Sequence, residues 1–554
     1  MTKTELKQNI TKINKLLRSD SYEAGIELIK TLDDPEIKKG TAKTVTAVIK
    51  KLLKQRDYDA IDTGIELARG LDEPSVFETL LDGCSIDKEG KLDRNKIFTG
   101  TDPAQPYLDY ALVNLIGYAP KDTKLDKSLE HSKVKKLDFY DYPWQKLPSG
   151  VGDFTNLTCL DLSNCNSLKN VDSLANLSNI TTLNLSGCNS LKNVDSLANL
   201  SNITTSNLGG CFSLENVDGL LNLTNIISLN LWGCRSLKNV DGLANCTNLA
   251  NLNLSGCISL ENVDGLANCT NLANLDLSIC ESLQNVDVLA NISNLTSLVL
   301  RGDDSLQNVE ILPNIPNLTS LDLRGFVSLQ NLESLPNFPN LTSLNLSWCE
   351  SLKNVDDLAK YTKITTLDLS GCKFIKNVDG LVKLPNLTNL NLAYCKSLKN
   401  VDGLANCFNI IILYMCDCKS LNNVDGLANL SSITTLNLGG CYFLKNIDGL
   451  ANLPNLTTID LSAMGLARDY VENVDSLVNL TNLTTLDLSG RSKSLQNVNG
   501  LANLPNLSNL NLSYCDKVQP KIKKESWDIY DTKLNLGTRK EVAAYQKEIK
   551  KSIK

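Results

Sequence analysis

Leucines and a cysteine return at fixed places along most of the chain. In residues 341–363, Leu341, Leu344 and Leu346 are followed by Cys349, and the arrangement recurs every 23 residues. Apolar residues at alternate positions predict a short strand with one face buried. The segment after the cysteine, S-L-K-N-V-D-x-L-A, is too short for an ordinary α-helix and predicts a 3₁₀ or single helical turn. A period of this length predicts a solenoid with one parallel strand per repeat.

Two further positions hold their residue type through the array. The cysteine recurs at Cys165, Cys188, Cys211, Cys234, Cys257, Cys280, Cys349, Cys372, Cys395, Cys418 and Cys441, with Asp303 and Phe326 in the two gaps. We expect these thiols to be reduced, buried and unpaired, and to contribute packing only. An aspartate stands before x-L-A in most repeats, as at Asp241, and suits a cap on the free N–H groups of the turn.

The pattern L-x-x-L-x-L-x-x-C resembles the signature of leucine-rich repeats. The fuller unit, as in Asn216–Leu231, is similar to the bacterial internalin-type repeat, with N-V-D-G-L in place of D-I-S-P-L. It departs from that repeat by Cys instead of Asn at the turn and by one extra residue after it. The resemblance implies an α/β solenoid, a horseshoe with a parallel sheet on its concave face and short 3₁₀ turns on its convex side. Repeats of this kind bind unrelated partners, so the resemblance says little about function.

The chain divides into three segments by pattern. Residues 1–130 lack the period and predict helices, with two similar stretches that begin at Leu16 and Leu52 and indicate a duplicated hairpin. Residues 131–515 predict about 17 repeats. Residues 516–554 are basic, and Thr538 to Glu541 predicts a capping box that opens a helix. Residues 1–130 serve either as a cap or as a separate interaction domain; the lack of a flexible linker favours the cap.

The net charge and the placement of the cysteines restrict which classes of partner and which cellular compartment we expect. The net charge is −7, and an acidic repeat array disfavours nucleic acid as a partner. The opening MTKTELKQNI has no apolar core of a signal peptide, and no segment is long enough to insert into a membrane. Reduced thiols imply a cytoplasmic protein. The cysteine column lacks the paired spacing of zinc sites, so we expect no metal site. We also expect a monomer.

Catalytic motifs are missing from the sequence. His131 is the single histidine, and no cysteine or serine partner for it is evident. The sequence has no phosphate-binding loop, no H-E-x-x-H and no kinase motif set. We therefore expect a binding protein that is not an enzyme and has no cofactor.

Candidate binding residues are those that break the repeat pattern. Most outward strand positions carry Thr, Ser, Asn or Asp, as at Thr182, Asn184 and Ser186. The departures that we predict to bind a protein partner are Val299, Arg301, Arg324, Trp348, Tyr394, Tyr414 and Asp417. Arg, Trp and Tyr dominate the energetics of interfaces. Drift in a duplicating array is the competing interpretation, and it is the one we prefer for Trp232, an isolated exception.

Two alternative functions stay open. The chain could be a bacterial effector that acts on host proteins after export, which would keep the binding chemistry and change its destination. Rows of Thr, Ser and Asn on a flat sheet could instead order water, as in ice-binding solenoids. Asp residues within these rows count against ice binding.

Overall fold

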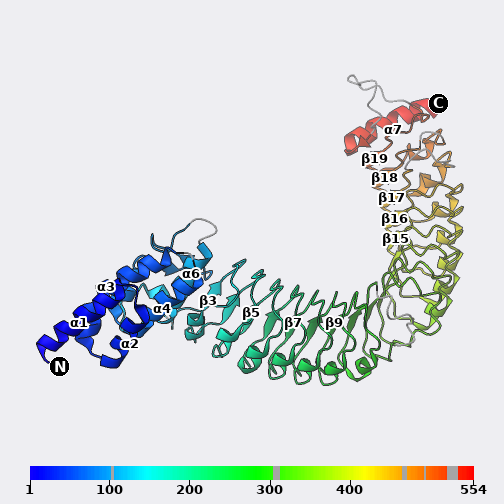
Figure 1. Cartoon of the computed structure of the whole chain (residues 1–554). Helices are drawn as coiled ribbons and strands as arrows, with labels where there is room; N and C mark the ends of the chain where they lie inside the picture. Colours follow the sequence, from blue (N-terminus) through cyan, green and yellow to red (C-terminus); the bar gives the residue numbers. More distant parts are fainter. Residues whose placement is uncertain are drawn as a thin grey trace. The chain divides into compact units, whose positions relative to one another are not determined.

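The computed structural model describes residues 1–55, 57–100, 105–130, 132–302, 312–463, 471–491, 494–520 and 535–553. The chain forms two compact units, Met1–Leu272 (unit 1) and Ala273–Lys554 (unit 2). The two units share the same repeat architecture and are described separately below (Figure 1).

Unit 1 begins with a helical region, as the sequence predicts. Its elements are α1 (Lys3–Arg18), α2 (Tyr22–Leu32), α3 (Pro35–Leu53), α4 (Tyr58–Leu71), α5 (Pro74–Leu81), the hairpin strands β1 (Ser85–Ile86) and β2 (Leu92–Asp93), and α6 (Gln105–Gly117). The duplicated L-D-x-P motif ends one helix and starts the next. Asp33 and Asp72 adopt the left-handed conformation after α2 and α4, while Pro35 and Pro74 take the first position of α3 and α5.

The repeats of unit 1 follow the helical region. Their strands are β3 (Lys136–Asp138), β4 (Cys159–Asp161), β5 (Thr182–Asn184), β6 (Thr205–Asn207), β7 (Ser228–Asn230) and β8 (Asn251–Asn253). Each strand pairs in parallel with the next at an offset of one repeat, as Leu160 does with Leu183. The register therefore follows the sequence period.

Unit 2 continues the pattern. Its strands are β9 (Asn274–Asp276), β10 (Ser297–Val299), β11 (Ser320–Asp322), β12 (Ser343–Asn345), β13 (Thr366–Asp368), β14 (Asn389–Asn391), β15 (Ile412–Tyr414), β16 (Thr435–Asn437), β17 (Thr458–Asp460), β18 (Thr485–Asp487) and β19 (Asn509–Asn511). They form one open parallel sheet in which Leu321 pairs with Leu344. The offset lengthens between β17 and β18, where Thr458 pairs with Thr485 after an insertion.

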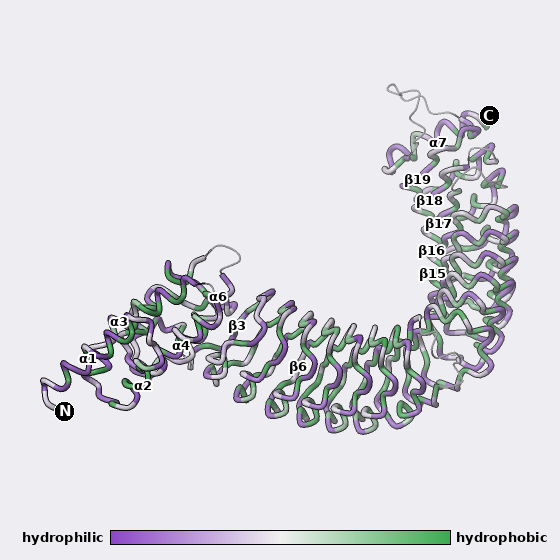
Figure 2. Tube along the Cα trace, viewed as in Figure 1, coloured by the Kyte–Doolittle hydropathy of each residue, from purple (hydrophilic) through white to green (hydrophobic). Residues whose placement is uncertain are grey.

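Within each unit the strands line one face and the 3₁₀ turns the opposite face (Figure 1). The chain alternates between hydrophobic and hydrophilic stretches along every repeat (Figure 2), and the leucines of the repeats are buried between the two faces. A typical turn is the 3₁₀ segment Asp241–Leu243. The fold class expected from the sequence is confirmed.

The buried thiols do more than pack. The Sγ of Cys257 donates a hydrogen bond to the backbone carbonyl of Leu231 at 3.2 Å, and Cys372 and Cys395 repeat the contact in unit 2 with Leu346 and Leu369 at the same distance. Each of these carbonyls already accepts a backbone N–H of its own repeat, as Leu231 does from Cys234 at 3.2 Å, and the thiol of the next repeat adds a second hydrogen bond. The expectation that the thiols contribute packing only was therefore incomplete.

The aspartate of the 3₁₀ turn is not its cap, contrary to our expectation. Asp241 begins the turn, and its side chain makes no capping hydrogen bond. Its backbone N–H instead donates to Oδ1 of Asn239 at 3.1 Å, and Asp402 and Asn400 repeat the arrangement at 3.3 Å. The asparagine of N-V-D is therefore the capping residue, because a side chain two positions earlier reaches the free N–H in an Asx turn.

The helical region of unit 1 contacts the first repeat through buried polar groups. The carboxylate of Asp109 in α6 is almost fully buried and forms an ion pair with Arg94, which also donates to the hydroxyl of Tyr142 at 2.8 Å. The indole of Trp144 donates to the carbonyl of Pro106 at 2.8 Å. A charge buried at such a junction needs its partner, so these contacts tie α6 to the repeats.

The last repeat is covered by a short strand and a helix. Strand β20 (Asn535–Leu536) pairs antiparallel with β19. Helix α7 (Arg539–Ile553) follows, and the expected capping box is present: the N–H of Glu541 donates to Oγ1 of Thr538 at 3.3 Å and Oε2 of Glu541 accepts from the Thr538 N–H at 3.1 Å. Pairing and coverage protect the exposed edge of the sheet.

The buried thiols make stability fall at alkaline pH. Burial raises the pKa of Cys257 to about 12, against roughly 8.5 for an unfolded thiol. The folded state holds the proton more tightly, so stability is complete below pH ~8.5 and falls by about 1.4 kcal/mol per pH unit per thiol above it. We expect Cys257→Ala to reduce this slope when urea midpoints are compared across that range. Leu252→Ala, which removes a buried side chain without a proton, should leave the slope unchanged; equal slopes in all three proteins would contradict the prediction.

Candidate functional site

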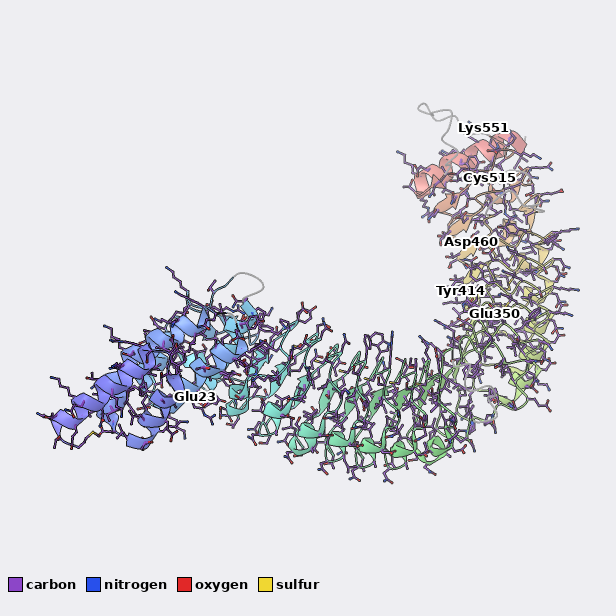
Figure 3. The ribbon with its side chains drawn as sticks, in the orientation of Figure 1. Glu23, Glu350, Tyr414, Asp460, Cys515 and Lys551 are labelled. Carbon is purple, nitrogen blue, oxygen red and sulfur yellow. The ribbon has the colours of Figure 1, made fainter. Side chains whose placement is uncertain are left out.

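The seven predicted binding residues all lie in unit 2, from the end of β10 to the turn that follows β15. Val299 ends β10 and pairs in register with Asp276 and Asp322. Tyr414 holds the corresponding place at the end of β15, between Asn391 and Asn437. Tyr414 is exposed on the strand face, where Figure 3 labels it, whereas Val299 is half-buried.

The two predicted arginines extend along the sheet toward the next repeat. The Nε of Arg301 lies 2.8 Å from Oδ2 of Asp322, and the Nε of Arg324 donates to Oγ of Ser347 at 3.1 Å. The carboxylate of Asp322 is largely buried, so Arg301 compensates a charge that would otherwise be costly. Arg301 therefore has a structural role. Arg324 contacts Ser347 of the next repeat, the residue immediately before Trp348.

Trp348, Tyr394 and Asp417 do not lie on strands, which corrects our sequence-based placement. Each immediately precedes a cysteine of the column and has a positive φ, of 61°, 61° and 57° respectively. Most other repeats have glycine here, such as Gly256 and Gly371, because the left-handed conformation brings a Cβ into conflict with the backbone. We call this place the left-handed position of the repeat.

Trp348 and Tyr394 form an aromatic pair across the intervening repeat. Their ring centroids lie 6.1 Å apart and their planes differ by 26°. Gly371 lies between them, and a Cβ on it would lie 2.7 Å from Cδ2 of Trp348. The glycine thus leaves room for the indole. Both rings are exposed, Trp348 at 46 % and Tyr394 at 42 % of their full area.

The sequence analysis missed three exposed hydrophobic residues in the repeats from β13 to β15. They are Phe374, Phe408 and Ile411. Phe374, at 56 % the most exposed, stands where most repeats have the serine of C-x-S-L. A search of this serine column, in addition to the strand positions, would have found it.

Trp232 in unit 1 is exposed, and its Cζ3 lies 3.9 Å from the place of a Cβ on Gly210. The guanidinium of Arg235 lies 4.8 Å from the ring centre of Phe212, and Phe212 reaches to within 3.9 Å of the place of a Cβ on Gly233. Arg235 thus covers the ring of Phe212. The interpretation of Trp232 as drift stays a prediction.

The regular polar rows elsewhere have structural partners. The Oδ1 of Asn184 accepts from the N–H of Ser186 at 3.1 Å, and its Nδ2 donates to Oδ2 of Asp161 at 3.0 Å. Asn391 and Asp368 repeat the second contact at 3.1 Å. These side chains are thus committed to joining neighbouring repeats.

Two other classes of site are missing from the part of the chain that the structure describes. Its described residues contain no group of three or more His, Cys, Asp or Glu that could hold a metal ion. None of its described helices is both long enough and apolar enough to cross a membrane. His131 lies outside the described residues.

Comparison with protein families settles the identity of the array. A model described as "Leucine-rich repeat region" matches residues 130–330, and one described as "BspA type Leucine rich repeat region (6 copies)" matches residues 345–464. The chain is a leucine-rich repeat protein. Such repeats are scaffolds for protein–protein interaction, with an extended surface in place of an enclosed pocket.

Solved structures share the repeat. An internalin of Listeria monocytogenes is 19 % identical, with 68 % of this chain and 94 % of that chain covered at a TM-score of 0.40. A leucine-rich repeat protein of Leptospira interrogans is 18 % identical, with coverages of 65 % and 91 % and a TM-score of 0.42. TLR13, solved in complex with ssRNA13, is 19 % identical, with coverages of 78 % and 67 % and a TM-score of 0.41. No curated protein matches the chain.

The place of the Trp348 ring depends on Gly371. In Gly371→Ala the new Cβ would meet the indole at 2.7 Å, so we expect the ring to move away and the tryptophan fluorescence to change. Gly256→Ala is the matched control: it has nearly the same φ, but its Cβ would meet only backbone, at 3.5 Å. Both variants should lose similar stability, about 1–2 kcal/mol. Identical spectra of the two variants would show that the indole does not lie over Gly371.

Proposed function

We propose that this protein is a non-catalytic scaffold that binds a protein partner on the strand face of unit 2, around the aromatic pair. The observation that carries the proposal is the pairing of two exposed rings, Trp348 and Tyr394, with centroids 6.1 Å apart, both at left-handed positions. Bulky residues at positive φ are uncommon, and they cluster at functional sites, where the strain is retained for a reason.

Drift alone accounts poorly for this arrangement. A change from glycine to tryptophan or tyrosine at the left-handed position costs about 1–2 kcal/mol of backbone energy. The resulting rings stay exposed, so they recover little of that energy by burial. Exposed aromatic rings placed side by side are instead the residue type that anchors protein interfaces.

The proposal also covers the compartment in which the protein acts and its lack of catalytic activity. None of the 18 cysteines forms a disulfide, which supports a reducing compartment such as the cytoplasm. Delivery into a host cell as an effector would use the same surface. The non-enzymatic assignment is supported by the extended, repeat-built surface around the aromatic pair.

Removal of the aromatic pair should abolish binding without harm to the fold. Trp348→Gly plus Tyr394→Gly restores the residue that most repeats have at this position. Relief of the left-handed strain roughly offsets the entropy cost of glycine, so stability should stay within about 1 kcal/mol of wild type. Partner binding should weaken by about 2 kcal/mol or more per ring. Affinity capture from lysate with the intact protein, quantified by mass spectrometry, measures the difference.

The chain supplies a matched control for this experiment. Ile279 and Tyr514 also occupy the left-handed position, at φ 56° and 60°, and are about equally exposed. Ile279→Gly plus Tyr514→Gly should therefore change the backbone energy alike and leave capture intact. A protein set captured equally by wild type and by both double variants would overturn the proposal.

A further inference from the structure

A group of lysines lies beside the aromatic pair. The residue two places after the left-handed position is Lys373, Lys396 or Lys419 in three successive repeats, and the residue five places after it is Lys376 or Lys399. We call Lys373, Lys376, Lys396, Lys399 and Lys419 the lysine strip. Four of its members are exposed, and Lys373 is half-buried.

The repeat geometry sets the spacing of the strip. The backbone N–H of Lys399 donates to the carbonyl of Lys376 at 3.0 Å, so these two repeats are in register at this place. Successive lysines therefore begin about one strand spacing apart, ~4.8 Å. Lys396 follows Tyr394 with only the buried Cys395 between them, so the strip runs alongside the aromatic pair.

Little negative charge offsets the strip. Lys373 forms an ion pair with Glu350, with Nζ and Oε1 2.6 Å apart. Among the described residues, no ion pair joins Lys376, Lys396, Lys399 or Lys419 to a carboxylate. Like charges this close repel one another, and an anionic partner would relieve the repulsion.

Lysine at the first of these places is local to these repeats: the other repeats have residues such as Asn189, Phe212 and Ile258 there, with Arg235 as a second basic residue type. The second place holds lysine in several other repeats too, as at Lys169, Lys238 and Lys353, so the doubled lysines of the strip come from the first place. Phe374, which is exposed, lies between Lys373 and Lys376. Lysine charge, exposed phenylalanine and the aromatic pair therefore coincide in the repeats of β12–β15.

We infer that the protein partner presents an acidic segment carrying apolar or aromatic side chains to this surface. The inference rests on the proposed function and names the chemistry of its partner. Carboxylates of the segment would pair with the lysine strip and speed association, while its apolar side chains would contact Phe374 and the aromatic pair. Charge complementarity and apolar contact then act at neighbouring places on one partner.

A protein segment fits better than a nucleic acid. Asp368 and Asp417 belong to the repeats of the strip, and Asp460 on β17 lies two repeats beyond Lys419, where Figure 3 labels it on the strand side together with Tyr414. A nucleic acid carries an unbroken row of phosphates, which these carboxylates would repel. An acidic peptide can place its charges over the lysines alone.

The test uses the intact protein and defined probes. The first probe is a fluorescein-labelled peptide of alternating Glu and Phe, followed by fluorescence anisotropy. We expect it to bind wild type, and its Kd to rise about tenfold or more in Lys396→Glu plus Lys399→Glu. Added salt, from roughly 50 to 500 mM, should weaken binding to wild type through screening. Lys169→Glu plus Lys238→Glu makes the same charge change at two second-place lysines of unit 1 and should change Kd less than about twofold.

Two further probes decide against the inference if they bind as well as the first. They are the matching Lys and Phe peptide and a thymidine oligonucleotide; tighter binding of the oligonucleotide would assign the surface to nucleic acid. All four substituted lysines are exposed, so unfolding midpoints should be unchanged. If the glycine variants of the aromatic pair lose the captured partner and the strip variant keeps it, this inference fails while the proposed function stands. The reverse result would overturn the proposed role of the aromatic pair, and with it the apolar contact inferred here, and would leave the charge contact of the strip.

Discussion

The left-handed turn at the end of each strand is the constraint on which the repeat depends. It reverses the chain and points the next residue, a cysteine, into the core, where its thiol reaches a carbonyl of the preceding repeat, as Cys257 reaches Leu231. The same turn holds its own side chain away from the core. One conformation therefore secures the stacking of repeats and offers, at low cost to packing, a solvent-facing position.

The separation of buried stacking residues from solvent-facing positions explains why function can vary on a uniform scaffold. Leucines and cysteines pack against or bond to a neighbouring repeat, and each capping asparagine accepts from the turn of its own repeat, so their replacement would leave a cavity or an unsatisfied polar group. Side chains at the left-handed position and at the two lysine places can be replaced without leaving a cavity or an unsatisfied polar group in the core. Trp348 and Lys396 occupy them without displacing any core residue.

The sequence was informative where one residue type serves one geometric purpose. The alternation of leucines predicted the strands, and the Thr538 capping box predicted α7. Hairpin β1–β2 and strand β20 were missed, because strands of two residues are too short to show alternation. The left-handed position was also missed, although glycine before cysteine in most repeats marks it. Without that observation, Trp348 was placed on a strand.

The candidate site was harder to predict, because its residues come from places with different backbone roles. Arg301 and Trp348 both stand out from the repeat, yet Arg301 compensates the buried charge of Asp322 while Trp348 stays exposed. Sequence shows the departure in both cases and cannot show which one has a partner within the fold. The distinction needs the register between repeats, since the partner of Arg301 lies on the next strand. For a repeat protein, then, a departure from the consensus becomes evidence of binding only after contacts to both neighbouring repeats have been accounted for. The aromatic pair and three lysines of the strip, Lys376, Lys396 and Lys399, remain after that accounting, and they belong to successive repeats.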